Sequence, residues 1–264
     1  MAEYETIQLD ASPGGVAVIL LNRPETRNAF NALMIEELTD AFENLRSEEQ
    51  LRMVVLKGAG KAFSAGAALD WMRAASTYSR DENEQDAFAL AEMLRRLYEL
   101  PQTTLALVHG AAMGGGAGLV AACDLAVATK GTSFRFSEVR LGLTPATISP
   151  YVIAAIGPRW AKALFITAEG FDAAYAENIG LVQYTVDDET GLAEMEEYLA
   201  SLAFQAAPGA VADSKRLVRD VTGGIIDQSL GKDTAKRIAA RRASQEGREG
   251  ISAFLEKRKP DWAT

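Results

Sequence analysis

The stretch LALVHGAAMGGGAGLVAACD, Leu105 to Asp124, contains the features that decide the fold. Its first residues, Leu105 to Val108, are apolar and predict a buried strand. Leu119 to Cys123 predicts a helix, and Gly110 and the triplet Gly114–Gly116 lie between the two. A glycine turn from strand to helix can aim unpaired backbone N–H groups into a cleft, where they would hold an anion or a developing oxyanion. Close packing of the helix on a sheet explains the same glycines, so both interpretations stand.

Length and composition indicate one large domain, or one domain with an appendage, since the chain has 264 residues and is 48% hydrophobic. The net charge of −9 argues against nucleic acid as a partner, but an anionic small molecule can still bind locally. Cys123 is the single cysteine, and its apolar helix favours a core position over a nucleophilic one. The segment MAEYETIQLD does not resemble a signal peptide, and no apolar run reaches the ~18 residues of a membrane span. We therefore expect a soluble, cytoplasmic protein without a membrane partner.

Hydrophobic periodicity before this stretch predicts alternating strands and helices. The expected elements are a hairpin of Ile7–Leu9 and Val16–Leu21 with the turn Pro13-Gly14-Gly15, a loop over Leu21–Phe30, an amphipathic helix over Ala32–Leu45, a strand over Met53–Leu56, a strand–loop–helix passage over Lys61–Met72, and a helix over Asp81–Tyr98.

After this stretch the pattern passes from mixed to helical. The expected elements are a strand over Leu125–Ala128, a turn and short strand over Gly131–Phe136, a partly irregular segment over Phe136–Gly157, helices over Trp160–Thr167 and Phe171–Gly180, a strand over Leu181–Val186, and helices alone from about Leu192, with Pro208 in a first helical turn. This order indicates an α/β core followed by an α-helical tail.

The chain contains two passages from strand through glycine loop to helix. If parallel strands bring them side by side, each can donate one N–H to the same oxygen, which is the arrangement of an oxyanion hole. Such a hole needs a nearby carboxylate or histidine for proton transfer. His109, the only histidine, is better explained as a structural residue at a strand end. Glu138 lies among apolar and small residues where its pKa could be raised, although spacing alone favours an ion pair with Arg140 or a surface position.

Five ordered motifs carry a resemblance that runs nearly end to end. They are LNRPETRNAF, GAGKAFSAGAAL, HGAAMGGGAGLVAACDLAVA, FRFSEVRLGLTPA and AFLEKRKPDW. The chain resembles the crotonase, or enoyl-CoA hydratase/isomerase, superfamily. This resemblance implies an α/β fold with a ββα spiral core over residues 1–191 and a helical oligomerisation region over residues 192–264, assembled as a homotrimer or homohexamer. GGGAGLVAACD and SEVRLGLTPATISPYVIAAIG are similar to the bacterial methylglutaconyl-CoA hydratase-like group, whose members act in leucine and acyclic-isoprenoid breakdown.

The resemblance also implies roles for individual residues. The two oxyanion-hole donors correspond to the N–H groups of Ala67 and Gly115, and the catalytic glutamate to Glu138. The positions matching those that contact coenzyme A are Arg23, Ala65, Ala67, Phe254 and Lys257, the last two reaching it in many relatives from a neighbouring subunit. Ordinary solvated charge is the alternative for Arg23 and Lys257. The resemblance implies no metal and no permanently bound cofactor, because coenzyme A arrives as part of an acyl-CoA substrate.

Two positions depart from the family pattern. Hydratases of the family commonly hold water between two glutamates, and the position of the second is here Gly118, although a glutamate introduced there would be expected to point into the same cleft. Ala68 replaces a loop aspartate that chiefly orients. The expected substrate pocket comprises Trp71, Gly118, Thr147 and Tyr151.

Three functions remain open from the sequence. They are hydration or dehydration of a branched enoyl-CoA, isomerisation of an enoyl-CoA double bond, and binding of a CoA thioester with little catalysis. The presence of both glycine loops together with Glu138 disfavours the third function, binding with little catalysis. For the first, the sequence does not choose among Thr147, Tyr151 and a distal substrate carboxylate as the group that holds water.

Overall fold

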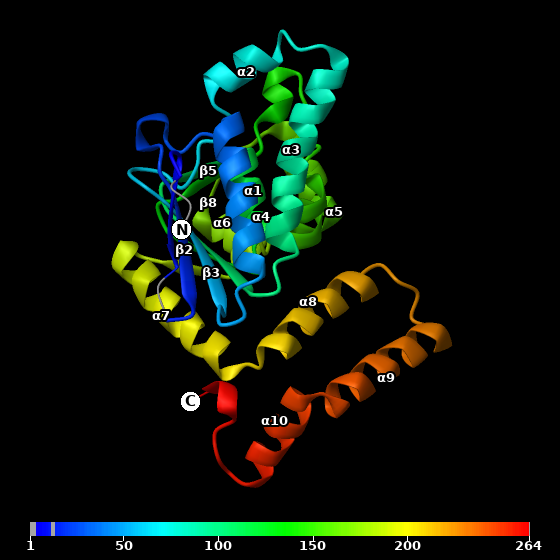
Figure 1. The fold of residues 1–264 in the computed structure, drawn as a ribbon. Helices are drawn as coiled ribbons and strands as arrows, with labels where there is room; N and C mark the ends of the chain where they lie inside the picture. The colour runs from blue at the N-terminus through cyan, green and yellow to red at the C-terminus, as the bar shows by residue number, and fades with distance from the viewer. Residues whose placement is uncertain (1–3, 12–13, 264) are drawn as a thin grey trace.

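A computed structural model describes residues 4–11 and 14–263, which form an α/β body and a helical arm (Figure 1). The main sheet has the strand order β1-β2-β3-β4-β6-β9. Its strands are β1 (Ile7–Ala11), β2 (Val16–Leu21), β3 (Met53–Gly58), β4 (Thr103–Val108), β6 (Leu125–Thr129) and β9 (Tyr184–Val186). β1 and β2 form the predicted antiparallel hairpin, while the other neighbours pair in parallel. Pro13 of the predicted turn lies outside the described residues.

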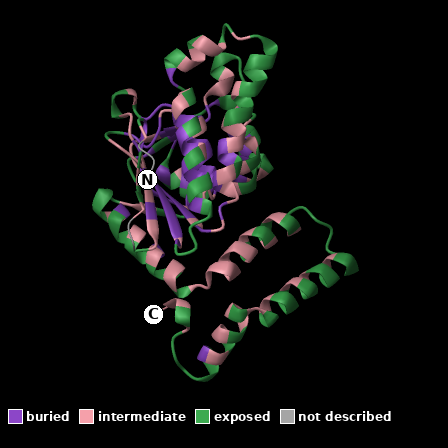
Figure 2. Cartoon of the chain, viewed as in Figure 1, coloured by how far each residue is buried: buried purple, intermediate pink, exposed green. Residues whose placement is uncertain are grey.

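Alternate residues of the central strands face two different hydrophobic layers, as the period of two in a strand requires. Val54 and Leu56 of β3 join the large core beneath α1 (Ala32–Arg46), α3 (Arg80–Tyr98) and α4 (Gly115–Ala122). Met53 and Val55 face the opposite side and pack with α7 (Glu189–Gln205) through Leu192 and Leu199. Both sides of the parallel sheet are therefore covered, and the buried residues concentrate in this body (Figure 2).

The first helices begin at residues that satisfy their free N–H groups. The Asn31 side chain accepts a hydrogen bond from the N–H of Met34 and starts α1, as the predicted amphipathic helix requires. Ser79 and Glu82 form a capping box that starts α3. α2 (Leu69–Ala75) contains no buried residue and lies at one end of the body. The helices predicted before the glycine-rich stretch are thus confirmed to within a residue or two.

A second, three-stranded sheet follows the main one and was only partly predicted. It has the order β5-β7-β8, with β5 (Ala111–Met113) parallel to β7 (Ser133–Arg135) and β8 (Phe171–Asp172) antiparallel to it. Three-residue strands of small side chains carry little periodic signal, so β5 was missed. α4 begins at Gly115 and not at Leu119, because packing on the body overrides the low helix propensity of glycine.

The segment predicted to be partly irregular, 136–157, is irregular up to residue 148 except for the 3-10 helix over Glu138–Leu141, and it is α-helical from Ser149. α5 runs over Ser149–Thr167 and contains a kink at Gly157, whose φ of 73° is not helical. Pro150 is tolerated because it lies in the first turn, and Pro158 starts the second half after the kink. The predicted helix over 171–180 is shorter than expected, since β8 occupies its first residues and α6 covers only Ala173–Asn178.

The arm comprises α8 (Pro208–Val221), α9 (Gln228–Ala243) and α10 (Gln245–Leu255) and extends away from the sheet (Figure 1). Pro208 is in the first turn of α8, as predicted. The Lys215 ammonium joins α8 to the body, since Nζ lies 2.6 Å from Asp124 Oδ2 and donates to Gln102 O at 2.8 Å. α8 and α9 bury no residue within the described chain, and α10 buries only Ala253. No helix in the described ranges is long and apolar enough to cross a membrane.

Candidate active site

The two glycine loops lie side by side because the chain continues to pair beyond the ends of β3 and β4. Ser64 donates its backbone N–H to Ala111 O at 3.0 Å, and Met113 donates to Ser64 O at 3.0 Å. One residue pair earlier, Phe63 donates to His109 O at 2.9 Å. These bonds bring the loop after β3 against the loop after β4, as the sequence predicted for parallel neighbours.

A third segment, which contains Phe30, pairs with the loop after β3. Phe30 donates its N–H to Gly66 O at 2.6 Å, and Ala68 donates to Phe30 O at 2.8 Å. Ala67 lies between these two bonds, and its own N–H donates to no other described residue. The N–H of Gly115, the first residue of α4, is likewise without an acceptor in the described chain. Two neighbouring loops therefore each present a free backbone donor, and an oxyanion is bound where two such donors converge on one point.

Each glycine at the start of α4 is approached by a different neighbour. A Cβ on Gly114 would lie 3.1 Å from Glu138 Oε1, and one on Gly115 would lie 2.8 Å from the Phe30 ring. A Cβ on Gly116 would lie 2.7 Å from Ser64 O. Close packing therefore accounts for the run of glycines, while the binding of an oxyanion by this turn stays a prediction.

The Glu138 carboxylate lies against this helix start. Glu138 opens the 3-10 helix η2 (Glu138–Leu141), and its Oε1 is the atom that faces Gly114. Its Oε2 is buried and has no hydrogen-bond partner among the described residues, and no ion pair joins it to Arg140 there. Burial raises the pKa of the carboxyl above its ordinary value, while its own backbone N–H lowers it less. The ion pair that spacing favoured is absent, and the carboxyl has the environment of a general acid or base.

Gly118 faces Ile148. A Cβ at this position would lie 2.3 Å from Ile148 Cγ2 and 2.9 Å from Ile148 Cβ. Ile148 itself is buried, at 1% exposed. A glutamate at 118 would therefore have to displace Ile148 before it could reach the cleft, and its direction beside Glu138 stays a prediction.

Asn28 is a positioning residue that the sequence analysis missed. It is fully buried at a φ of 55°, a left-handed conformation that asparagine tolerates better than most residues. Its Nδ2 donates to Ala59 O at 2.9 Å and to Ala62 O at 2.8 Å, and its Oδ1 accepts from Arg23 N at 2.8 Å. These bonds fasten the loop over residues 22–30 to the loop that presents Ala67. In the sequence, the only indication of this role was an asparagine inside a charged loop.

The predicted pocket residues lie on three different elements. Trp71, on α2, donates its Nε1–H to Asp86 Oδ1 at 2.9 Å and so joins α2 to α3. Tyr151, in the first turn of α5, packs edge-on against Tyr98 at a ring-centroid distance of 5.3 Å. Burial raises the pKa of the Tyr151 hydroxyl. Thr147 lies in the segment between η2 and α5.

The predicted coenzyme A residues divide into two groups. Ala65 and Arg23 lie near the loops, since Ala65 N donates to Arg27 O at 2.9 Å and Arg23 Nη1 donates to Ala29 O at 2.7 Å. Phe254 and Lys257 lie at the far end of the molecule, at and just after the end of α10 (Figure 1). Phe254 is 82% exposed. One chain alone does not bring the two groups together.

The only histidine and the only cysteine of the sequence are not part of the candidate active site. His109 Nε2 is 2.9 Å from Gly60 O, a contact that fastens the turn after β3. Burial strongly raises the pKa of the Cys123 thiol, so the thiol stays protonated and is not a nucleophile. In the described ranges no three His, Cys, Asp or Glu side chains come together as metal ligands.

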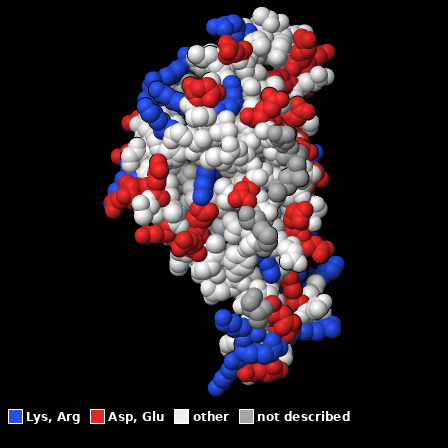
Figure 3. Space-filling view, turned by 60° about the vertical axis from the view of Figure 1, so that its left-hand side comes forward, with Lys and Arg blue, Asp and Glu red and all other residues white. Residues whose placement is uncertain are grey.

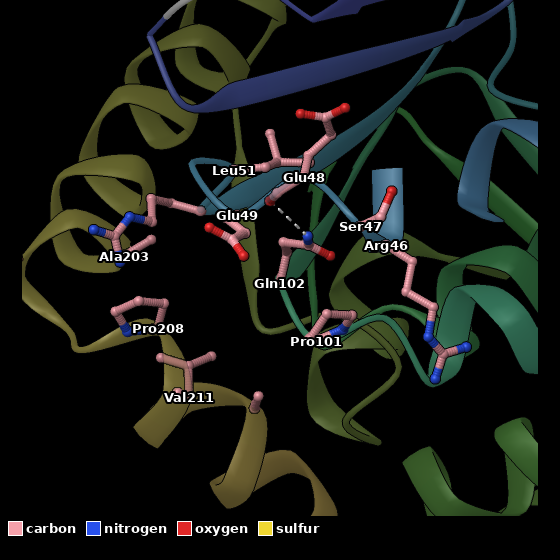
Figure 4. Close-up of a pocket in the computed structure, with 13 residues that line it drawn as sticks. Arg46, Ser47, Glu48, Glu49, Leu51, Pro101, Gln102, Ala203, Pro208 and Val211 are labelled. Carbon is pink, nitrogen blue, oxygen red and sulfur yellow. Dashed lines mark hydrogen bonds between the residues drawn. The ribbon is translucent and has the colours of Figure 1, made fainter. Parts of the chain in front are cut away.

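A cavity of about 250 Å³ lies at the opposite edge of the sheet (Figure 4). It is bounded by the residues just before β3 and β4 and by the start of α8. Gln102 lines it and donates to Leu45 O at 2.9 Å and to Glu48 O at 3.4 Å. The glycine loops follow the carboxyl ends of β3 and β4, so this cavity is separate from the candidate active site.

The site thus combines two loops with free backbone N–H groups and a partly buried carboxyl without an ion pair in the described chain. The family model Enoyl-CoA hydratase/isomerase matches residues 11–264. A Thermus thermophilus protein named as an enoyl-CoA hydratase is 35% identical over 252 residues, covering 94% of this chain and 97% of its own. The crotonyl-CoA hydratase of Syntrophomonas wolfei is 32% identical and covers 98% of each chain. The crystal structure of an enoyl-CoA hydratase from Shewanella pealeana superposes with a TM-score of 0.95 at 39% identity, covering 98% of this chain and 97% of that one.

The chain belongs to the enoyl-CoA hydratase/isomerase family. The match confirms the predicted resemblance, the crotonase-like fold and the prediction of an enzyme of the hydratase type. The subgroup, the acyl chain and the roles of individual residues stay predictions.

Proposed function

We propose that the protein catalyses hydration and dehydration of a branched enoyl-CoA thioester of the methylglutaconyl-CoA type. In this proposal the N–H groups of Ala67 and Gly115 bind the thioester oxygen as charge develops on it. Glu138 takes a proton from water, the resulting hydroxyl adds to Cβ, and Glu138 then gives that proton to Cα. The observation that carries the proposal is the position of the Glu138 carboxyl: its buried Oε2 has no partner in the described chain, and its Oε1 lies against Gly114, the residue before the free N–H of Gly115.

The raised pKa of Glu138 supports its role. A carboxyl with a raised pKa is a stronger base than an ordinary glutamate, and it stays protonated up to a higher pH, so that it can serve first as base and then as acid. Position 118 is a glycine against which Ile148 packs, so it supplies no second carboxylate to assist Glu138. Thr147, Tyr151 or a distal carboxylate of the substrate is left to hold the water.

Product analysis on a panel of enoyl-CoA thioesters, including methylglutaconyl-CoA, tests this proposal. We expect loss of absorbance at the conjugated thioester and incorporation of one oxygen from labelled water. The branched substrates should have the highest kcat/KM. Turnover of straight chains alone would contradict the proposed substrate class, and no oxygen uptake from any substrate would contradict hydration.

Isomerisation of the double bond is the second candidate, and the single carboxylate favours it. Moving a proton between two carbons needs one group that acts first as base and then as acid, and Glu138 is sufficient for that. The same panel separates the two reactions, because isomerisation shifts the double bond without water uptake. A protein that binds CoA thioesters but changes none of them is the third outcome.

Coenzyme A is proposed to bind along the loop over residues 22–30 and the loop that contains Ala65. Arg23 has an exposed fraction of 20% in its side chain, and its nearest carboxylate oxygen, on Glu25, is 4.0 Å away. Its guanidinium is thus placed to meet a phosphate. Phe254 and Lys257 would contact the same cofactor only from a neighbouring subunit, since they lie far from these loops in their own chain.

The helical region over residues 192–264 is proposed to form the subunit contacts. The arm leaves large apolar side chains exposed, among them Ile225, Ile226, Ile238, Ile251 and Leu255. Between residues 228 and 259 the chain has nine Lys and Arg but four Asp and Glu, although the whole chain is acidic. Figure 3 shows basic side chains at the end of the molecule that the arm forms, whereas acidic side chains are frequent over the body. Apolar area and opposite charge both favour contact between the arm and another copy.

We therefore expect a homotrimer, or a homohexamer made from two trimers. Multi-angle light scattering at micromolar concentration should give a mass of about three or six times 28.3 kDa. A truncated chain ending before α9 should lose this assembly. A monomer at micromolar concentration would refute the proposed contacts.

A further inference from the structure

The segment that contains Glu138 is attached to the start of α4 at both of its ends. Before Glu138, Gly114 donates its N–H to Arg135 O at 2.9 Å. After it, Leu143 donates to Glu138 O at 3.1 Å, which closes the turn of η2. The segment then reaches Ile148, whose side chain lies against Gly118. Gly114 and Gly118 are one helical turn apart, so both attachments meet the same turn of α4.

Glu138 has few contacts of its own that would fix its position. Its Oε2 accepts no hydrogen bond in the described chain, and it forms no ion pair there. Apart from the backbone N–H of Glu138 itself, no group in the described chain holds this carboxylate, so its position follows that of its own backbone. The contacts at the two ends of the segment therefore decide how far Oε1 lies from Gly114 and from the free N–H of Gly115.

The contact between Ile148 and Gly118 is one of the tightest glycine approaches in the body. Any Cβ at 118 would meet Ile148 Cγ2 at 2.3 Å, a separation that real atoms do not adopt. Ile148 is also the residue that starts α5, because its carbonyl accepts from Tyr151 N at 3.2 Å and from Val152 N at 3.1 Å. A displacement of Ile148 would therefore move the first turn of α5 and the end of the Glu138 segment together.

We propose that Ile148, seated on Gly118, is a positioning residue for Glu138. The inference rests on the proposed function, since it assumes that the Glu138 carboxyl transfers the proton. In this proposal Gly118 matters because it has no side chain at all, and not only because it lacks a carboxylate. It allows α5 to approach α4 closely enough to place Glu138 beside the free donors.

Replacing Gly118 with Ala tests this positioning role. Alanine normally stabilises a helix relative to glycine, so a loss of stability must come from the contact with Ile148. We expect Gly118→Ala to lower Tm by several degrees and kcat on the order of 10-fold or more, with KM for the thioester little changed, since a shift of about 1 Å can cost ~10²-fold in rate. The pKa of Glu138, followed through the ¹³C-carboxyl signal that disappears in Glu138→Gln, should fall toward its ordinary value as the segment moves outward.

The double variant Gly118→Ala/Ile148→Gly should recover most of the Glu138 pKa and of kcat, because removal of both Cγ2 and Cβ leaves room for the new methyl, which then packs against position 148 in their place. Gly131→Ala is the matched control, since a Cβ there meets nothing within 4 Å, and it should change neither quantity. A Gly118→Ala variant with unchanged kcat and Glu138 pKa would overturn the proposal, as would a double variant no better than the single one. A wild-type protein inactive on every thioester would refute the proposed function, while the pKa measurement would still test the positioning.

Discussion

Glu138→Gln should reduce turnover of the preferred enoyl-CoA by at least ~10²-fold, the usual lower end for a general acid–base residue. The amide keeps the shape of the carboxyl but cannot take up or release the proton. Thioester binding should barely change, because the proposed coenzyme A contacts lie on other segments. Steady-state kinetics, with a separate titration of a non-reactive acyl-CoA, measure the two effects independently.

The same substitution should stabilise the folded protein at neutral pH. Burial raises the pKa of Glu138 in the folded state above its value in the unfolded state, so the folded state binds more protons between those two values. Its contribution to stability is thus present at low pH and is lost as pH rises through the folded pKa. We expect Glu138→Gln to raise Tm by a few degrees at pH 8 and by much less near pH 4, with Arg140→Gln, on the exposed side of η2, as the control. Retention of most activity by Glu138→Gln would show that another group, Tyr151 or Asp70, carries the proton.

The parts of the fold that the sequence predicted well are those with strong local patterns. The helix over Ala32–Arg46 and the strand over Met53–Gly58 each have an apolar periodicity that one element accounts for. The start of α4 at Gly115 was missed because three glycines disfavour a helix locally, and only the neighbours that need their lack of a side chain explain them. The first half of α5 was missed because Pro150 and Gly157 suggest loops, although the first is in an initial turn and the second is a kink.

The candidate site, too, contains one part that the sequence predicted and one part that it did not. Glycine loops after two parallel strands predicted that Ala67 and Gly115 would lie in adjacent loops, because parallel pairing follows from the alternation of strands and helices. The surroundings of Glu138 could not be predicted, since Gly114, which its Oε1 faces, is 24 residues away along the chain. The contact of Ile148 with Gly118 is equally non-local. Such contacts depend on the packing of whole helices, which a single sequence does not record.

Gly115→Pro should reduce turnover by a factor on the order of 10²–10³, the usual effect of deleting one oxyanion donor. Proline removes the N–H of Gly115 and nothing else from the hydrogen bonds of α4, because this N–H has no acceptor in the described chain. Gly115 is also the first residue of the helix, where the fixed φ of proline is tolerated. The variant is therefore expected to fold, and far-ultraviolet circular dichroism and Tm should be recorded beside the kinetics.

Gly115→Ala separates the lost donor from the added bulk. Either new side chain meets the Phe30 ring, which lies 2.8 Å from a Cβ at this position, but alanine keeps the N–H. If the donor stabilises the oxyanion, the alanine variant should lose far less turnover than the proline variant, and both should bind acyl-CoA ground states similarly, because the oxyanion forms only during the reaction. Equal losses in the two variants would assign the effect to displacement of Phe30. A folded proline variant with an unchanged rate would show that the oxyanion is bound by another donor.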